Sequence, residues 1–253
     1  MYSNNNYDEC LKSLNEKGFY CFENFLIEDD LKMLQNITDK FLKKNNNNSF
    51  FLMDEKLDDT FINEKKFIEK FYKIFFELSE KENLKNFQTK KIFKNLRVIS
   101  QSKMHSTSYD FHFDAHQYTI LVPIIIPDSG NENTNGNLIL FPNLRKKTTY
   151  LIVNLLQKIF YQNKITKKIL QFISSKKILK KEILNFKYNN IYIFNGFRSL
   201  HGNQPVLKGH VRATLLLHFY DVFENSSLVN LNRLFRKYIE NKNIKKNINQ
   251  GSL

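Results

Sequence analysis

The second half of the chain consists of short β-rich runs separated by turn residues, and this pattern limits the fold more than any other feature. Three of the runs are NLRVISQSKM (95–104), YTILVPIIIP (118–127) and HVRATLLLHFYDV (210–222). Further runs are DFHFDAH (110–116), GNLILFP (136–142) and YNNIYIFNGF (188–197), and one intervening turn is PDSGNENTNG (127–136). Many short strands with frequent turns are typical of sandwiches and barrels. We therefore expect an all-β core over about residues 93–222.

The first ninety residues are expected to be largely helical. Apolar side chains recur at helical spacing in 7–16 and 28–44, and acids at 28–30 favour the positive end of the second helix. Between these helices GFYCFENFL (18–26) is predicted to be a strand that follows a glycine. Residues 57–86 continue the helical pattern through an apolar stripe, which predicts a helix packed on the core: Phe61, Phe67, Phe71, Ile74 and Phe75.

Length and composition predict one large domain. The chain has 253 residues, of which 42% are apolar, and we expect a single domain over 1–230 followed by a basic tail at 231–253. No run of eighteen apolar residues occurs, and the N-terminal residues are polar, so a soluble, cytoplasmic protein is expected. The two cysteines, Cys10 and Cys21, are too few for a disulfide scaffold and suit a reducing compartment. The oligomeric state is left open.

The positive charge is concentrated in two segments. Of a net charge of +14, residues 145–187 carry +11 and the tail 231–253 carries +5. The first segment interrupts the β-rich runs, and Ile165, Ile169, Phe172 and Ile173 fit an amphipathic helix. This basic insertion could be a lid or docking surface for an anionic molecule, a contact with a membrane surface, or a lysine-coated helix whose apolar side packs on the core.

The run YDFHFDAHQYT (109–119) contains three ligand-type side chains at alternate positions: His112, Asp114 and His116. Alternate side chains of a strand share one face, so two imidazoles and a carboxylate would project together. A further histidine, His201, lies far downstream in FNGFRSLHGNQPV. Two histidines and one carboxylate form the set that holds Fe(II) on one face and leaves other positions open. Asp114 with His116 has the same spacing in reverse, so either histidine of the run could complete the set.

The order and spacing of these residues resemble the Fe(II)/2-oxoglutarate-dependent oxygenases, and most closely the phytanoyl-CoA dioxygenase-like family. The pattern is His112-x-Asp114, His201 eighty-seven residues after the aspartate, and Arg212 eleven residues further on. The segments LNEKGFYCFENFLIEDDLKMLQ (14–35), FNGFRSLHGNQPV (194–206) and RATLLLHFYD (212–221) are similar too. The resemblance covers roughly residues 8–221. It implies a double-stranded β-helix, which is a jelly-roll of the cupin type, buttressed by N-terminal helices.

The resemblance also implies roles for individual residues. His112, Asp114 and His201 would ligate iron, with His112 preferred because the histidine precedes the aspartate in the family. Arg212 would pair with the distal carboxylate of 2-oxoglutarate, since a guanidinium matches both oxygens of a carboxylate. Thr214 would add a hydrogen bond from the same strand face. Arg97 is a further candidate for the cosubstrate, and His116 and Arg145 are candidates for the substrate. His105, His210 and His218 are expected to be structural.

The implied reaction is hydroxylation of an unactivated C–H bond in a small, anionic molecule. It would use Fe(II), 2-oxoglutarate and O2, with ascorbate as an optional reductant, and would release succinate and CO2. Desaturation or ring rearrangement would need the same cofactors and stays open. One alternative is a jelly-roll binding module without turnover. A nucleic-acid-directed dioxygenase is less favoured, because no basic face interleaved with aromatic residues falls on the strands.

Overall fold

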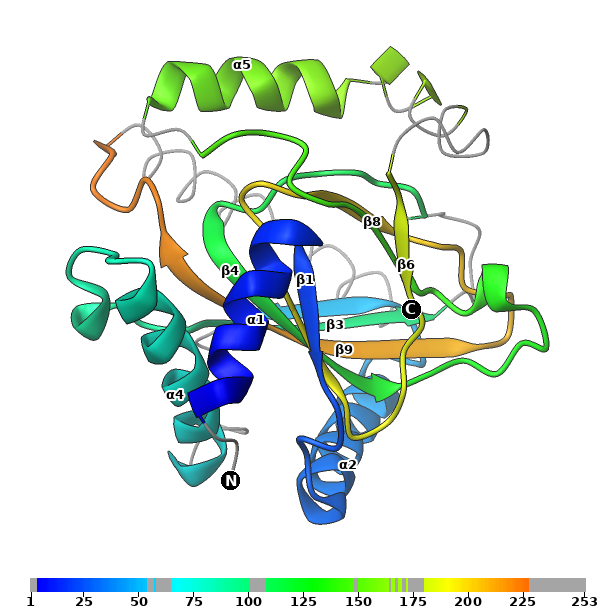
Figure 1. The fold of residues 1–253 in the computed structure, drawn as a ribbon. Coiled ribbons are helices and arrows are strands. Elements are labelled where there is room, and N and C mark those ends of the chain that lie inside the picture. Colours follow the sequence, from blue (N-terminus) through cyan, green and yellow to red (C-terminus); the bar gives the residue numbers. More distant parts are fainter. Residues whose placement is uncertain are drawn as a thin grey trace. The chain divides into compact units, whose positions relative to one another are not determined.

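The structure is a computed structural model that describes residues 4–53, 57, 65–100, 108–147, 150–163, 165–166, 168–169, 172 and 180–227. Contacts divide the chain into two units, Met1–Tyr220 and Asp221–Leu253. The first unit contains the helices and almost all of the strands (Figure 1). Phe61, His105, Ile173 and the tail 231–253 lie outside the described residues.

Two antiparallel sheets form the core of the first unit. The larger has the order β1-β7-β4-β9-β3-β2 and the smaller has the order β6-β5-β8. These strands and the flanking helices confirm the expected fold class, a mainly β jelly-roll with helical additions. The strand bounds are β1 (Phe19–Phe22), β2 (Phe50–Met53), β3 (Phe93–Ser100), β4 (His116–Ile125), β5 (Leu138–Phe141), β6 (Glu182–Leu184), β7 (Ile191–Phe194), β8 (Leu200–Asn203) and β9 (Val211–Asp221).

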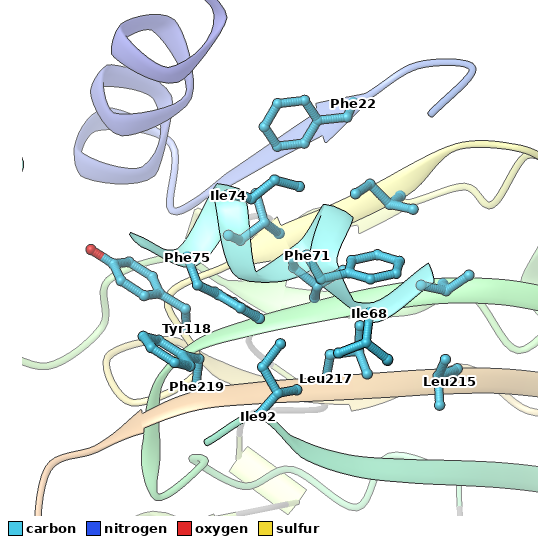
Figure 2. Packing of buried hydrophobic residues seen from close by; sticks show 14 of the residues in the cluster. Phe22, Ile68, Phe71, Ile74, Phe75, Ile92, Tyr118, Leu215, Leu217 and Phe219 are labelled. Carbon is cyan, nitrogen blue, oxygen red and sulfur yellow. The ribbon is translucent and has the colours of Figure 1, made fainter. Parts of the chain in front are cut away.

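Three helices of the N-terminal part bury their apolar sides against one face of the larger sheet. They are α1 (Asn4–Glu16), α2 (Glu28–Lys44) and α4 (Lys65–Lys81), and short 3-10 turns occur at Phe87–Thr89 and Glu132–Thr134. Figure 2 shows Phe71 and Phe75 of α4 packed near Leu217 and Phe219 of β9, and the rings of Phe75 and Phe219 stack 4.8 Å apart. This packing confirms that the described residues of the predicted apolar stripe, Phe67, Phe71, Ile74 and Phe75, belong to the core.

Alternation along β9 divides its side chains between two environments. Ala213, Leu215, Leu217 and Phe219 join the cluster under the helices. Their neighbours Arg212, Thr214, Leu216 and His218 must therefore point to the opposite face. The same alternation in β4 sends Ile120 and Val122 to the helices and Leu121 toward the smaller sheet. Polar side chains of β9 consequently lie inside the roll, where every polar atom has to find a partner.

The structure corrects three details of the sequence analysis. Residues 110–115 are not a regular strand, because β4 begins only at His116 and His112 forms an isolated bridge with His201. The first ninety residues contain β2 as well as helices. The basic insertion begins with α5 (Leu151–Gln162), which the sequence analysis did not predict, and it contributes strand β6; the described residues of the stretch predicted to be helical, Ile165, Ile169 and Phe172 among them, are helical as expected.

The apolar residues of the insertion are exposed. Ile165, Ile169 and Phe172 have 72%, 49% and 62% of their surface accessible, so the prediction that this apolar side packs on the core is wrong for these residues. Among the described residues no helix is both long enough and apolar enough to cross a membrane.

Candidate metal centre

Backbone hydrogen bonds hold the 109–114 segment against β8 and the turn before it. His112 and His201 exchange both of their backbone hydrogen bonds, with N···O distances of 2.9 and 3.0 Å. The amide of Asp114 donates to the carbonyl of Gly196 at 3.0 Å, and that of Tyr109 donates to Asn203 at 2.8 Å. A pair that exchanges both bonds presents its side chains on the same side. Residues almost ninety positions apart are thereby placed next to each other.

Three ligand-type side chains converge there. Within the described part of the chain, His112, Asp114 and His201 form the group that could hold a metal ion, with one ligand atom from each lying within 4.8 Å of the others. Oδ1 of Asp114 lies 3.5 Å from Nε2 of His201 and 3.9 Å from Nε2 of His112. His201 and Asp114 are buried, whereas 37% of the His112 side chain is exposed. The group is therefore open to solvent on the His112 side.

Both imidazoles direct Nε2, the nitrogen whose lone pair is free to ligate a metal, toward Asp114. Nδ1 of His112 lies 2.9 Å from the carbonyl oxygen of Asp110, and Nδ1 of His201 lies 3.0 Å from that of Ser199. A carbonyl oxygen only accepts hydrogen bonds, so each Nδ1 has to be the donor. The lone pair of each neutral ring is then on Nε2, which is the atom that faces Asp114.

The second oxygen of Asp114 is held by two residues from the adjoining strands. The hydroxyl of Thr119 on β4 donates to Oδ2 of Asp114 at 2.5 Å. Because this hydroxyl has only one proton, it must accept from Nδ1 of His218 on β9, which lies 3.0 Å away. The relay fixes the carboxylate and leaves Oδ1 directed toward the two imidazoles.

Electrostatics keep the carboxylate ionised. Burial alone would raise the pKa of Asp114, but His201 and His218 hold the pKa of this carboxyl well below its usual value. Burial and the neighbouring His201 lower the pKa of His112 to about 4, so its ring is neutral near pH 7. Burial opposes the charged form of His201, but Asp114 raises the pKa of this imidazole above its usual value. Protons therefore compete with a metal mainly at His201.

Gly196 provides space for Asp114, and enlarging it is expected to disturb the centre. A Cβ at residue 196 would collide with Oδ2 of Asp114 and approach Oγ1 of Thr119 to 2.6 Å. Gly196→Ala should therefore weaken Fe(II) binding about tenfold to a hundredfold, the range typical for residues that orient ligands. Titration of the metal-free protein under argon measures the effect. In the control Gly130→Ala the added methyl meets no atom within 4 Å, so the cost of the left-handed backbone there (φ +68°) falls on stability and the iron affinity of the folded protein should remain at the wild-type value.

Arg212 and Thr214 have unsatisfied polar atoms deep inside the roll. Each residue is only 1% exposed, and within the part of the chain that the structure describes Nε and Nη1 of Arg212 and Oγ1 of Thr214 have no hydrogen-bond partner. A buried guanidinium without an acidic partner is costly, and an anion would offset the cost. Gly136 leaves room for this arginine, because a Cβ there would lie 2.5 Å from its Cδ. The arrangement fits a carboxylate ligand.

Arg97 lies within electrostatic reach of both the metal-ligand group and Arg212. It lies on β3 opposite Thr214 of β9. Its charge acts to lower the pKa of His112, His201 and Arg212, so it lies within electrostatic reach of both sets. Burial first, and then Arg97, lowers the pKa of Arg212 to about 9. Two arginine cations close to the imidazoles make this interior attractive to an anion.

His116 and Arg145, the two residues that the sequence analysis assigned to the substrate, lie in different environments. His116 is outside the ligand group, and its ring stacks 5.3 Å from that of His218 and 5.8 Å from that of Phe93. Arg145 is buried, and its guanidinium lies 4.1 Å from the ring centres of both Phe113 and Phe197. Its Nη1 donates to side chains of α5, whereas Nη2 has no hydrogen-bond partner among the residues that the structure describes. Arg145 therefore joins α5 to the segments that carry the ligands.

Sequence reasoning missed the residues that support Asp114. His218 was expected to be merely structural, and Thr119 and Gly196 were not singled out. The alternation of β9 places His218 on the same face as Arg212 and Thr214, and this was a usable signal. Thr119 gave no comparable signal, because its role depends on how β4 and β9 pair. His210 lies elsewhere, with Nε2 located 3.1 Å from the carbonyl oxygen of Asp128.

Comparison with known proteins gives matches in fold. No protein-family model matches the sequence, and no curated protein matches it. A prolyl-4-hydroxylase from Pseudomonas putida has a TM-score of 0.52 at 8% identity, over 85% of this chain and 98% of that one. The epimerase SnoN from nogalamycin biosynthesis, solved with Fe3+, alpha-ketoglutarate and nogalamycin RO, has a TM-score of 0.54 at 8% identity, over 86% and 85%. The alpha-ketoglutarate-dependent carbocyclase SnoK has a TM-score of 0.55 at 11% identity, over 88% and 89%.

These matches define the class of fold. The chain has the jelly-roll fold found in solved non-haem, 2-oxoglutarate-dependent enzymes. At identities of 8–11% these structural matches show a shared fold alone, so the activity has to be argued from the residues of the site. The three structures do not test the finer resemblance to the phytanoyl-CoA dioxygenase-like family, which stays a prediction.

Proposed function

We propose that the protein is a non-haem Fe(II)/2-oxoglutarate-dependent dioxygenase that hydroxylates a C–H bond of a small, anionic molecule. The observation that carries this proposal is the combination of a His112, Asp114, His201 group with a buried Arg212 whose Nε and Nη1 have no hydrogen-bond partner among the described residues, inside one jelly-roll. The first could hold the metal and the second a dicarboxylate. Neither feature alone is specific to one chemistry, but together they offer binding sites for both iron and 2-oxoglutarate.

The ligand group fits ferrous iron. Two imidazole nitrogens and one carboxylate oxygen are the donors of the facial set for non-haem Fe(II), and the set leaves positions for other ligands. Hydrogen bonds to Asp110, Ser199 and Thr119 fix the orientation of all three side chains. When bound there, iron with 2-oxoglutarate and O2 supplies the oxidation and the release of succinate and CO2.

The arginine region fits the far carboxylate of 2-oxoglutarate. Arg212 offers Nε and Nη1, two buried donors without a partner among the described residues, and Thr214 lies two residues along the same strand face. Arg97, opposite Thr214 on β3, adds a second positive charge. These three residues would hold one end of the dicarboxylate, so that its keto-acid end is presented to the metal ligands.

The substrate class rests on charge near the ligand segments. Arg145 keeps Nη2 without a hydrogen-bond partner, and the insertion that contains it carries +11. An anionic group of the substrate would find a donor there. We assign His116 only a supporting role beside His218, on which its ring stacks. Hydroxylation is the reaction proposed, although the similar folds of an epimerase and a carbocyclase show that this architecture accommodates other outcomes.

A succinate-release assay tests the proposal and separates it from its main alternative. The purified protein with Fe(II), 2-oxoglutarate and O2 is expected to form succinate, faster when a suitable anionic substrate is added from a panel of acyl-CoAs, sugar phosphates and small acids. A binding module without turnover would bind metal and 2-oxoglutarate but form no succinate with any member of the panel. That result, obtained with iron-loaded protein, would reject the enzyme.

The pKa of Arg212 predicts how cosubstrate affinity depends on pH. The guanidinium binds a carboxylate only in its charged form, and its pKa is lowered to about 9. The affinity for 2-oxoglutarate should therefore be constant from about pH 7 to 8 and fall up to about tenfold per unit above the pKa. Calorimetry on the Mn(II)-loaded protein under argon measures it. Arg212→Met, which has no group to titrate, should bind weakly with no such decline.

A further inference from the structure

Helix α5 has its polar side turned toward the protein and its apolar side turned outward. Asn154 is buried, and both Asn154 and Gln157 accept hydrogen bonds from Nη1 of Arg145, at 2.8 and 3.2 Å. On the other side six apolar side chains are between 40% and 72% exposed, and at 100° per residue they span an arc of about 160°. These residues, which we call the outer face of α5, are Ile152, Val153, Leu155, Leu156, Ile159 and Phe160.

Exposure of large apolar side chains is concentrated in this region. Among the described residues, ten of the fifteen exposed large hydrophobic side chains lie between Tyr150 and Phe172. Single exposed apolar residues are common on proteins, but a contiguous group marks a surface that contacts something. Ile165, Ile169 and Phe172 extend the group beyond the helix. The outer face is therefore a contiguous apolar surface of the kind that docks on a partner, and not a set of single exposed residues.

The charge around the helix decides what kind of partner fits. Between residues 145 and 181 the sequence contains eleven Lys or Arg and no acid. Lys146 and Lys168, on either side of α5, are exposed. A second copy of the chain docked on this face would bring two such basic segments together, which is unfavourable. A nucleic acid would match the charge but make no use of the apolar side chains. An anionic lipid surface matches both.

We propose that the outer face of α5 docks on an anionic lipid bilayer, with the apolar residues inserted at the interface and the flanking lysines on the headgroups. A helix of twelve residues is about 18 Å long, too short for a hydrocarbon core of about 30 Å, so it would lie in the membrane plane. Each flanking lysine near an anionic surface adds to the attraction.

The inner side of α5 connects this surface to the metal ligands. The rings of Tyr161 on α5 and Phe113 pack 5.3 Å apart, and Phe113 lies between the ligands His112 and Asp114 in the chain. Arg145 contacts Phe113 and donates to two side chains of the helix. In Figure 1 α5 runs along one edge of the view, away from α2 and α4. Docking would therefore bring the ligand-bearing segment close to the bilayer, which suits a substrate with an acyl chain.

Vesicle flotation tests the docking. Full-length protein is mixed with phosphatidylcholine vesicles and with vesicles that contain about one third phosphatidylserine. We expect binding to the anionic vesicles only, and at least a tenfold loss of binding between about 0.05 and 0.5 M NaCl, where charges are screened. Lys146→Gln with Lys168→Gln should reduce binding in the same direction as salt.

Matched double variants assign the binding to the helix. Leu156→Gln with Ile159→Gln alters two residues that are each 61% exposed and keeps good helix propensity at position 156. It should lower the vesicle partition coefficient about tenfold or more, because apolar area no longer enters the interface. Ile27→Gln with Leu207→Gln changes exposed apolar residues elsewhere, 59% and 42% exposed, and should bind like the wild type. Circular dichroism confirms that both variants are folded.

Three outcomes would overturn the docking. They are no binding to anionic vesicles at low salt, equal loss of binding in both double variants, and a dimer in sedimentation equilibrium that Leu156→Gln with Ile159→Gln dissociates. The last would make the face a contact between copies. Vesicle binding needs no iron, so His112→Ala should still bind; failure here and failure of the proposed catalysis are therefore distinguishable.

Discussion

Asp114→Ala should abolish iron binding and lower 2-oxoglutarate-dependent succinate formation about a thousandfold or more. The carboxylate is kept ionised by His201 and His218 and directed by Thr119, and among the described residues no other carboxylate joins the ligand group. Loss of the oxygen donor leaves two imidazoles, which bind ferrous iron weakly. Iron content after anaerobic loading and desalting measures the first effect, and succinate formation measures the second.

Controls from the same segment make this result specific. Asp110→Asn changes another acid four residues away whose backbone carbonyl, and not its carboxylate, accepts from His112, so iron binding should remain. His112→Ala should lose iron, whereas His116→Ala should keep most of it, because His116 is outside the ligand group. Iron lost with His116→Ala and kept with His112→Ala would reverse the assignment of the first histidine.

Arg212→Met should weaken 2-oxoglutarate binding about a hundredfold or more while leaving iron binding intact. Removing one partner of a buried ion pair typically costs about 3–5 kcal/mol. The same change should leave the stability of the cosubstrate-free protein unchanged or raised, since it replaces an unpaired buried cation by an apolar chain of similar length. Calorimetric titration with 2-oxoglutarate and thermal unfolding without it measure the two effects.

Weaker 2-oxoglutarate binding together with unchanged or raised stability would separate a binding role of Arg212 from a structural one. A structural arginine would lose stability when replaced, and 2-oxoglutarate affinity would fall only through misfolding. Arg212→Lys keeps a charge but loses the paired donors, so its affinity should fall between those of the wild type and Arg212→Met. Equal 2-oxoglutarate affinity of the wild type and Arg212→Met would remove this residue from the cosubstrate site.

The ligand group was accessible from sequence because its chemistry depends on residue type and order. His112 and Asp114 stand two apart, and the spacing to His201 and Arg212 carries the resemblance. What brings His201 to His112 is a pair of backbone hydrogen bonds between distant segments. No local pattern encodes that bridge, and the regular strand expected at 110–116 does not form. The residue types were thus predictable, but the means of bringing them together was not.

Elements with a strong local pattern were predictable from the sequence, and elements that depend on a pairing partner were not. The helix expected over 28–44 has those bounds in α2, since its apolar spacing and first-turn acids are strong local signals. Strand β2 has four residues and β6 has three, and both depend on pairing with β3 and β5 respectively. Strands of this length gain their stability from the partner and not from their own sequence.

Helix α5 could not be oriented from its sequence. Amphipathic periodicity predicts that the apolar side faces the core, but here Arg145 holds the polar residues Asn154 and Gln157 inward. The buried guanidinium needs acceptors, and α5 supplies two of them. The orientation is set by a residue outside the helix, so periodicity within the helix gives the wrong side.

The most direct test of the central claim is anaerobic addition of Fe(II) and 2-oxoglutarate to the metal-free protein, followed by visible absorption spectroscopy. If the two imidazoles and Asp114 hold iron while Arg212 holds the cosubstrate, a weak charge-transfer band of the iron–keto-acid chelate should appear. It should be missing in Asp114→Ala and require far more 2-oxoglutarate in Arg212→Met. A folded wild-type protein that binds Fe(II) yet shows no band at saturating 2-oxoglutarate would contradict the account.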